Sequence, residues 1–213
     1  MGGVLGVHCS PRSAKWRRNF VSSVVDLLRV HPRLAGVHVN IEPMPSGNRD
    51  FLLLLDELRR AMPPGKILSV AAYPPPTLWH PFSDVHWDEA YFRDVAQRTA
   101  QLVPMMYDTA VRLPKLYRHL MASWTSEVLD WSGDTQVLLG IPAYDDAGVG
   151  YHFPAVENLQ NALWGIHAGL NARKSLPKNY AGVAIYCEWE MDPQEWDDFR
   201  REFERAPDGL TRR

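Results

Sequence analysis

Short apolar stretches alternate with longer amphipathic ones along almost the whole chain. The short stretches have the length and β-branched content of buried strands, and the longer ones space apolar residues three or four positions apart, as a helix with one buried face requires. This regular alternation predicts a parallel α/β sheet built from six βα units. Strands are expected at residues 4–8, 37–42, 66–73, 102–107, 136–142 and 183–187, with helices at about 13–30, 48–62, 87–100, 114–131, 159–173 and from 192 onward.

Proline, glycine and acidic residues mark where several of these helices begin and end. The Pro-Pro-Gly turn at residues 63–65 stops one helix, and Gly133 follows another. The last helix is expected to begin with Asp192 as N-cap, Pro193 at the first helical position and Glu195 completing a capping box. These signals agree with the strand and helix boundaries that the apolar periodicity predicts.

The most polar of the predicted strands is residues 37–42, VHVNIE. Side chains in a strand alternate between its two faces, so the three β-branched residues share one face and His38, Asn40 and Glu42 share the other. An imidazole, an amide and a carboxylate inside a sheet are costly unless they are hydrogen-bonded or used. The row is therefore a candidate site, and a polar strand end with satisfied hydrogen bonds is the alternative.

Six βα units fit either a doubly wound sheet or part of a (β/α)8 TIM barrel. Neither GxGxxG nor GxxxxGK[ST] occurs, which argues against a nucleotide-binding sheet. A barrel enzyme builds its site at the carboxyl ends of the strands, and a complete barrel takes about 250 residues. We therefore predict an incomplete TIM barrel, its first two units absent, over residues 1–205, with a disordered tail at 206–213. Polar and aromatic residues gather at the predicted strand ends: Glu42, Tyr73, Tyr107, Asp108, Tyr144, Asp145 and Glu188.

Composition excludes several classes of partner. The formal net charge is -2 and the arginines form only short pairs, so the chain has no basic stripe for a nucleic acid. No apolar run has the length of a membrane span. The 2 cysteines and 8 histidines show no ligand spacing, so we expect neither a metal nor another cofactor. No secretory leader is recognisable at the amino end.

Several motifs, in order along the chain, resemble those of the family 18 glycoside hydrolases, the chitinases and chitinase-like proteins. Residues 35–42, AGVHVNIE, are similar to the D-G-x-D-x-D-x-E of that family's fourth strand; they keep the glycine and the final glutamate but none of the aspartates. Residues 68–71 look like the fifth strand, and residues 105–108, MMYD, fit the M-x-Y-D of the sixth strand. Residues 140–144 and 182–186 are similar to the seventh and eighth strands. The resemblance covers the third to eighth units.

The resemblance implies substrate-assisted hydrolysis, in which the 2-acetamido group of the substrate attacks the sugar carbon. Glu42 would then be the proton donor, and Asn40 stands where the assisting aspartate stands. An amide can accept the acetamido N–H through its carbonyl, and the family 85 endo-β-N-acetylglucosaminidases use such an Asn-x-Glu pair. Tyr107 would donate to the acetamido carbonyl, and Asp108 would contact the same group or the sugar. A packed tyrosine and a loop-capping aspartate are the structural alternatives for these two.

The remaining candidates are residues that would bind the sugar. Aromatic side chains at strand ends can stack on sugar rings, although they also commonly pack in cores. His38 is expected to hydrogen-bond Asn40 or a backbone group rather than to titrate. The expected binding residues are His38, Tyr73, Tyr144, Tyr186, Glu188 and Trp189.

Three functions follow as hypotheses. The first is a glycosidase acting on glycans that contain N-acetylhexosamine, with an oligosaccharide or polysaccharide as its ligand. The second is a chitinase-like lectin that binds such glycans without cleaving them. The third is a truncated, inactive barrel whose open edges are covered by a partner; without such a partner we expect a monomer. The compartment stays open, and the resemblance implies export with a signal upstream of this sequence.

Overall fold

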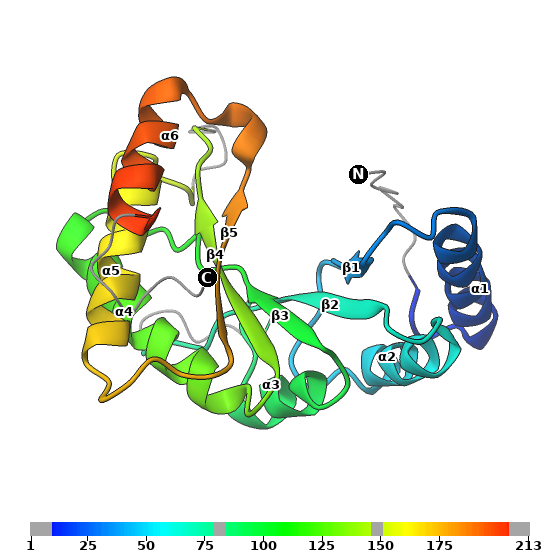
Figure 1. Cartoon of the computed structure of the whole chain (residues 1–213). Helices are drawn as coiled ribbons and strands as arrows, with labels where there is room; N and C mark the ends of the chain where they lie inside the picture. Colours follow the sequence, from blue (N-terminus) through cyan, green and yellow to red (C-terminus); the bar gives the residue numbers. More distant parts are fainter. Residues whose placement is uncertain (1–9, 79–83, 146–150, 205–213) are drawn as a thin grey trace.

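The computed structural model describes residues 10–78, 84–145 and 151–204. Its strands form one parallel sheet in the order β1-β2-β3-β4-β5, so each strand pairs with its neighbour in the sequence (Figure 1). The prediction of a barrel-type parallel sheet is confirmed for these units. The strand expected at 4–8 and the tail expected at 206–213 lie outside the described residues. The strands are β1 Gly36–Val39, β2 Ile67–Ala72, β3 Gln101–Pro104, β4 Gln136–Pro142 and β5 Tyr180–Tyr186.

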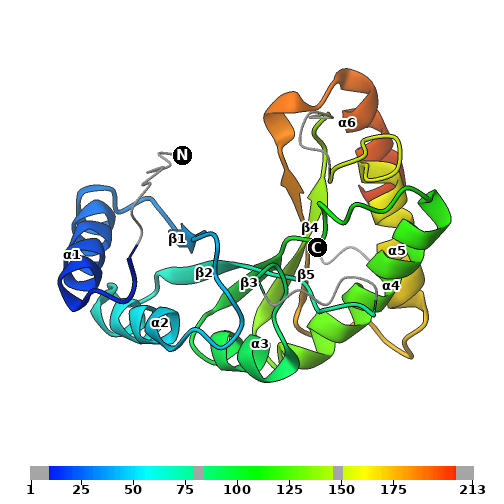
Figure 2. The ribbon, with the colours of Figure 1, turned by 180° about the vertical axis from the view of Figure 1, so that it is seen from behind.

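The helices cover one face of this sheet, and the opposite face, called here the open face, carries no helix (Figures 1 and 2). The capping box predicted at Asp192 and Glu195 is present at the start of the last α-helix. No helix within the described ranges has both the length and the apolar character that a bilayer crossing requires. The helices are α1 Ala14–Val30, α2 Arg49–Ala61, α3 Glu89–Ala96, α4 Pro114–Trp131, α5 Leu159–Asn171 and α6 Pro193–Phe199, with shorter helical turns η2 Glu188–Glu190 and η3 Arg200–Glu204.

Strands β1, β3 and β5 differ most from their predicted bounds: β3 ends at Pro104 rather than at 107, and the other two differ for identifiable reasons. Strand β1 pairs with β2 only from Gly36 to Val39, so the segment that follows continues beyond the ladder. Strand β5 begins at Tyr180 rather than Val183, because a register shift lets Val137 pair with Tyr180 while the next residue of β4 pairs with Gly182. Because of this bulge and its glycine, the alternation of apolar and polar residues does not indicate where β5 begins.

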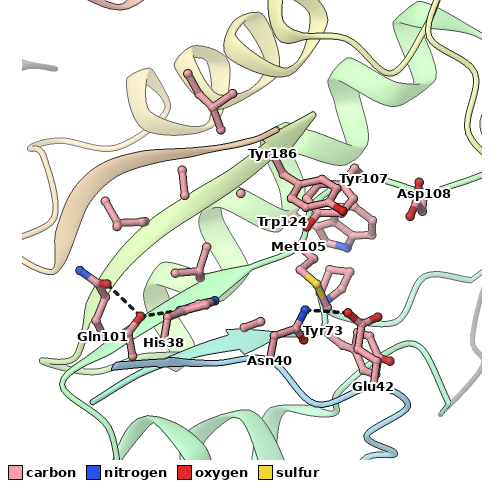
Figure 3. A pocket seen from close by; sticks show the side chains of 18 of the residues that line it. His38, Asn40, Glu42, Tyr73, Gln101, Met105, Tyr107, Asp108, Trp124 and Tyr186 are labelled. Carbon is pink, nitrogen blue, oxygen red and sulfur yellow. Dashed lines mark hydrogen bonds between the residues drawn. The ribbon is translucent and has the colours of Figure 1, made fainter. Parts of the chain in front are cut away.

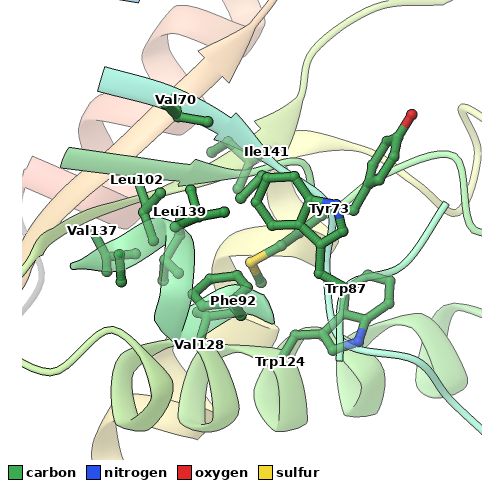
Figure 4. Packing of buried hydrophobic residues seen from close by; sticks show 14 of the residues in the cluster. Val70, Tyr73, Trp87, Phe92, Leu102, Trp124, Val128, Val137, Leu139 and Ile141 are labelled. Carbon is green, nitrogen blue, oxygen red and sulfur yellow. The ribbon is translucent and has the colours of Figure 1, made fainter. Parts of the chain in front are cut away.

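The hydrophobic core lies between the sheet and the helices. Val70, Leu102 and Leu139, on three neighbouring strands, are fully buried there and pack with Phe92 and Trp87 (Figure 4). Since neighbouring residues of a strand point to opposite sides, the residues between these core positions face the open side. The sequence that fills the core thus also determines which side chains line the open face.

Candidate active site

The open face of the sheet forms a cavity of about 1140 Å³. All five strands contribute to its walls, together with the loops that follow them. Tyr144 is not a lining residue: it is 9% exposed and lies behind the wall. Of the residues expected from sequence to form a site, those that line the cavity are His38, Asn40, Glu42, Tyr73, Tyr107, Asp108, Tyr186, Glu188 and Trp189.

Asn40 and Glu42 form a hydrogen-bonded pair just past the end of β1 (Figure 3). Asn40 Nδ2 donates to Glu42 Oε1 at 2.9 Å, and both side chains are exposed to the cavity. The amide nitrogen of Asn40 thus faces Glu42. Asn40 Oδ1 has no hydrogen-bond partner within the described ranges, which leaves it available to accept an N–H from a ligand.

Three tyrosines surround Glu42 closely enough for its charge to act on them. Burial and the Glu42 carboxylate raise the pKa of Tyr73 to about 12. Burial, followed by the charges of Glu42 and Asp108, raises the pKa of Tyr107 far above its usual value. The pKa of Tyr186 is raised chiefly by burial, with smaller effects of neighbouring acidic groups that include Glu42. All three therefore keep their phenolic protons near neutral pH and can donate hydrogen bonds.

Deeper in the cavity, a short chain of polar side chains crosses three strands. Ser69 Oγ donates to Gln101 Oε1 at 2.9 Å, and His38 Nδ1 lies 2.9 Å from the same Ser69 oxygen. The single serine proton is used on Gln101, so His38 must donate through Nδ1. Burial lowers the pKa of His38. The expectation that His38 bonds Asn40 or the backbone is wrong, because its partner is a serine on β2.

An aromatic wall lies opposite the β1 end of the cavity. The rings of Tyr107 and Tyr186 stack with centroids 5.5 Å apart, and Trp189 meets Tyr186 edge to face at 6.1 Å. Tyr186 is 48% exposed and Trp189 is 70% exposed, so both offer ring surface to a ligand. Trp124 of α4 also lines the cavity, with its indole N–H donating to a backbone carbonyl. Trp124 is not among the binding residues expected from the sequence.

Asp108 connects the cavity wall to a buried cluster behind it. The Tyr144 hydroxyl donates to Asp108 Oδ1. His152 Nδ1 lies 3.4 Å from Asp108 Oδ1 and 3.7 Å from Glu157 Oε2. Burial raises the pKa of Glu157 to about 7 despite its hydrogen bonds from Thr109. Neither His152 nor Glu157 was a candidate from the sequence.

Asp108 itself has a positive φ of 59°, a left-handed backbone conformation that aspartate tolerates better than most residues. This backbone conformation turns the chain directly after Tyr107. The tyrosine and the aspartate are thereby held on the same wall of the cavity, as the figure of the site shows (Figure 3).

A carboxylate, an amide and phenolic hydroxyls that converge on one cavity beside exposed aromatic rings can bind and polarise a sugar. No family model matches the chain, and no curated protein matches it significantly. Solved structures do match. A class V chitinase from Pseudomonas fluorescens has a TM-score of 0.63 at 12% identity, over 90% of this chain and 73% of that one. A chitinase from Chromobacterium violaceum has a TM-score of 0.60 at 16% identity, over 91% and 73%.

The spore cortex-lytic enzyme SleL of Bacillus cereus matches with a TM-score of 0.57 at 12% identity, over 88% of this chain. The chain spans 53% of the length of that enzyme. At these identities the similarity concerns the fold. The chain therefore has the partial TIM-barrel fold of the chitinases and related glycosidases, and the resemblance in the sequence motifs to family 18 is confirmed at the level of the fold.

Proposed function

We propose that this chain belongs to a glycosidase that cleaves glycans containing N-acetylhexosamine by substrate-assisted hydrolysis. The observation that carries the proposal is the hydrogen-bonded pair of Asn40 and Glu42 on a cavity of about 1140 Å³. The pair provides one proton donor and one group that can hold the acetamido N–H. The chitinases and the spore cortex-lytic enzyme of the same fold support the choice of substrate class.

In this mechanism Glu42 gives its proton to the glycosidic oxygen as that bond breaks. The acetamido carbonyl oxygen of the substrate attacks the anomeric carbon, forming a cyclic oxazolinium ion, and Asn40 Oδ1 accepts the acetamido N–H to orient it for attack. Tyr107 or Tyr186 donates its hydroxyl to the acetamido group. A water then opens the ring on the same carbon, and Glu42 takes up the proton of that water, which restores the acid.

The walls of the cavity supply binding. Trp189 and Tyr186 expose ring faces on which sugar rings can stack, while Tyr73, Asp108, His38 and Glu188 present polar groups for sugar hydroxyls. Tyr144 acts indirectly in this scheme, because its hydroxyl holds Asp108. The ligand is thus an oligosaccharide long enough to contact both walls.

The test measures the release of reducing ends from chitin oligosaccharides, peptidoglycan fragments and N-glycans. Glu42→Gln keeps the size of the side chain but removes the transferable proton, so we expect a loss of roughly 10²–10⁴-fold in kcat with binding retained. Glu127→Gln, on the outer helix α4, is the matched control, because its side chain does not line the cavity. The absence of any cleavage by the wild-type protein would overturn the proposal.

A second candidate is a glycan-binding protein without turnover. Asn40 favours it, because this amide cannot offer the negative charge that an assisting aspartate offers to the oxazolinium ion. Such a protein would bind chitin oligosaccharides and leave them intact over days. Asn40→Asp decides between the two: gain of hydrolysis from an inactive wild type supports the binding protein, and hydrolysis by the wild type excludes it.

A further inference from the structure

We propose that Asp108, His152 and Glu157 form a binding site for a divalent transition-metal ion of the zinc class, set into the wall behind the cavity. The ligand atoms of the three side chains all lie within 4.8 Å of one another. They come from the loop after β3, from the segment between β4 and α5, and from the turn that precedes α5. The proposal is independent of the proposed glycan chemistry.

The nitrogen of His152 is the strongest pointer to a bound cation. The side chain is fully buried, and its Nε2 lies 3.0 Å from the backbone oxygen of Tyr144. A carbonyl only accepts, so Nε2 carries a proton, and Nδ1 is the ring nitrogen turned toward the carboxylates. That Nδ1 has no hydrogen-bond partner within the described ranges and faces two carboxylates. A cation bound between this nitrogen and the two carboxylates would satisfy all three groups.

The distances fit a metal ion better than a shared proton. A protonated imidazole bonds a carboxylate at about 2.7–2.9 Å, whereas Nδ1 lies 3.4 Å from Asp108 Oδ1 and 3.7 Å from Glu157 Oε2. Zinc binds imidazole nitrogen and carboxylate oxygen at about 2.0–2.2 Å, which places neighbouring ligands of a tetrahedron about 3.3 Å apart. One nitrogen and two carboxylate oxygens suit zinc, cobalt and manganese.

Charge and supporting contacts agree with the same assignment. As metal ligands, two carboxylates and a neutral imidazole carry two negative charges, which one divalent ion neutralises inside the protein. The outer contacts that hold metal ligands in place are also present. The Tyr144 carbonyl orients His152, the Tyr144 hydroxyl holds Asp108, and Thr109 donates through its backbone and hydroxyl to Glu157. Each ligand is thus fixed before an ion arrives.

An ion here would tie together segments that surround the mouth of the cavity. Glu157 and His152 are fully buried, but the side chain of Asp108 is 36% exposed and lines the cavity, so the ion would be reached from that side. Through Asp108 and Tyr144 the ion would stiffen the aromatic wall. The metal therefore positions this wall rather than taking part in proton transfer.

The experiment uses the metal alone. The purified protein is treated with a chelator, dialysed, and titrated with Zn²⁺ and, separately, with Co²⁺ and Mn²⁺ near neutral pH. We expect one Zn²⁺ or Co²⁺ per chain with micromolar or tighter affinity, a rise in Tm on binding, and visible absorption bands from cobalt held by nitrogen and oxygen ligands. Asp108→Asn, His152→Asn and Glu157→Gln should each weaken binding by at least about tenfold.

His119→Gln is the control, because His119 is an exposed histidine on α4 whose loss should leave the affinity unchanged. If the two buried substitutions prevent folding, the partly exposed Asp108→Asn and the cobalt spectrum of the wild type still decide. The proposal is overturned if no ion binds stoichiometrically, or if binding survives Asp108→Asn or is lost with His119→Gln. Since no glycan is present, this result does not depend on whether the chain cleaves glycans.

Discussion

Individual side chains on the open face form hydrogen bonds that set their chemistry. Asn40 turns its nitrogen to Glu42 and so directs its oxygen to the cavity. His38 donates from Nδ1 to Ser69, which in turn donates to Gln101. Because the serine has a single proton to give, the direction of the hydrogen bonds along His38, Ser69 and Gln101 follows from counting protons. The Asn40 oxygen is therefore an available acceptor near the entrance of the cavity, and His38 is a neutral imidazole deeper in the cavity.

His38 gives the stability of the protein a pH dependence. Burial holds the pKa of His38 below its ordinary value of 6.5, so the unfolded chain binds a proton more readily than the folded protein. As the pH falls through about 6.5, the free energy of unfolding therefore decreases. His38→Asn keeps a donor near the position of Nδ1 but cannot titrate, and should remove part of this decrease. Urea unfolding at pH 7.5 and pH 5.5 measures it; equal pH dependence in both proteins would contradict the assignment.

Helices α4 and α5 pack with almost no space between their backbones at two glycines. A β-carbon added to Gly165 would lie 2.5 Å from the Arg118 carbonyl oxygen, and one added to Gly169 would lie 2.7 Å from that of Ala122. The two glycines are four residues apart, so they lie on the same side of α5. This contact brings α5 close to the helix that carries Trp124, a residue of the cavity wall.

Gly165→Ala should therefore destabilise the protein. In an exposed helix the same change would stabilise by up to about 1 kcal/mol through helix propensity, but here the added carbon meets backbone and should cost about 1–3 kcal/mol. Ala168→Met, at an exposed position of α5, adds more atoms without a clash and should change stability by no more than about 0.5 kcal/mol. Urea unfolding of both variants measures the difference. If Gly165→Ala and Ala168→Met were equally stable, α4 and α5 would be able to move apart enough to accommodate the added carbon.

The whole molecule is a curved sheet whose two ends supply opposite walls of one cavity (Figure 1). Asn40 and Glu42 follow β1 at one edge, while Tyr186 and Trp189 lie at and beyond the end of β5 at the other. A ligand that contacts both walls adds interactions that the unfolded chain does not have. Binding and stability are consequently linked.

Chitin oligosaccharides should raise Tm by an amount that grows with the logarithm of their concentration above Kd, corresponding to about 2.7 kcal/mol at a hundredfold excess over Kd. Cello-oligosaccharides have the same backbone without the acetamido groups, so they should raise it much less. Trp189→Ala removes a ring that is 70% exposed and should reduce the shift without altering the Tm of the free protein. Thermal unfolding with each ligand measures this. An equal shift with both sugars would argue against recognition of the acetamido group.

The sequence by itself determined the order of the βα units, the bounds of α4 and β4, and the polar row of His38, Asn40 and Glu42. These features depend on periodicity and spacing within a few residues, which local backbone geometry fixes. The tertiary structure alone decided the bulge before Gly182, the serine partner of His38 and the meeting of Asp108 with His152 and Glu157. Those contacts join strands and loops far apart in the chain, and only the pairing and curvature of the sheet bring them together.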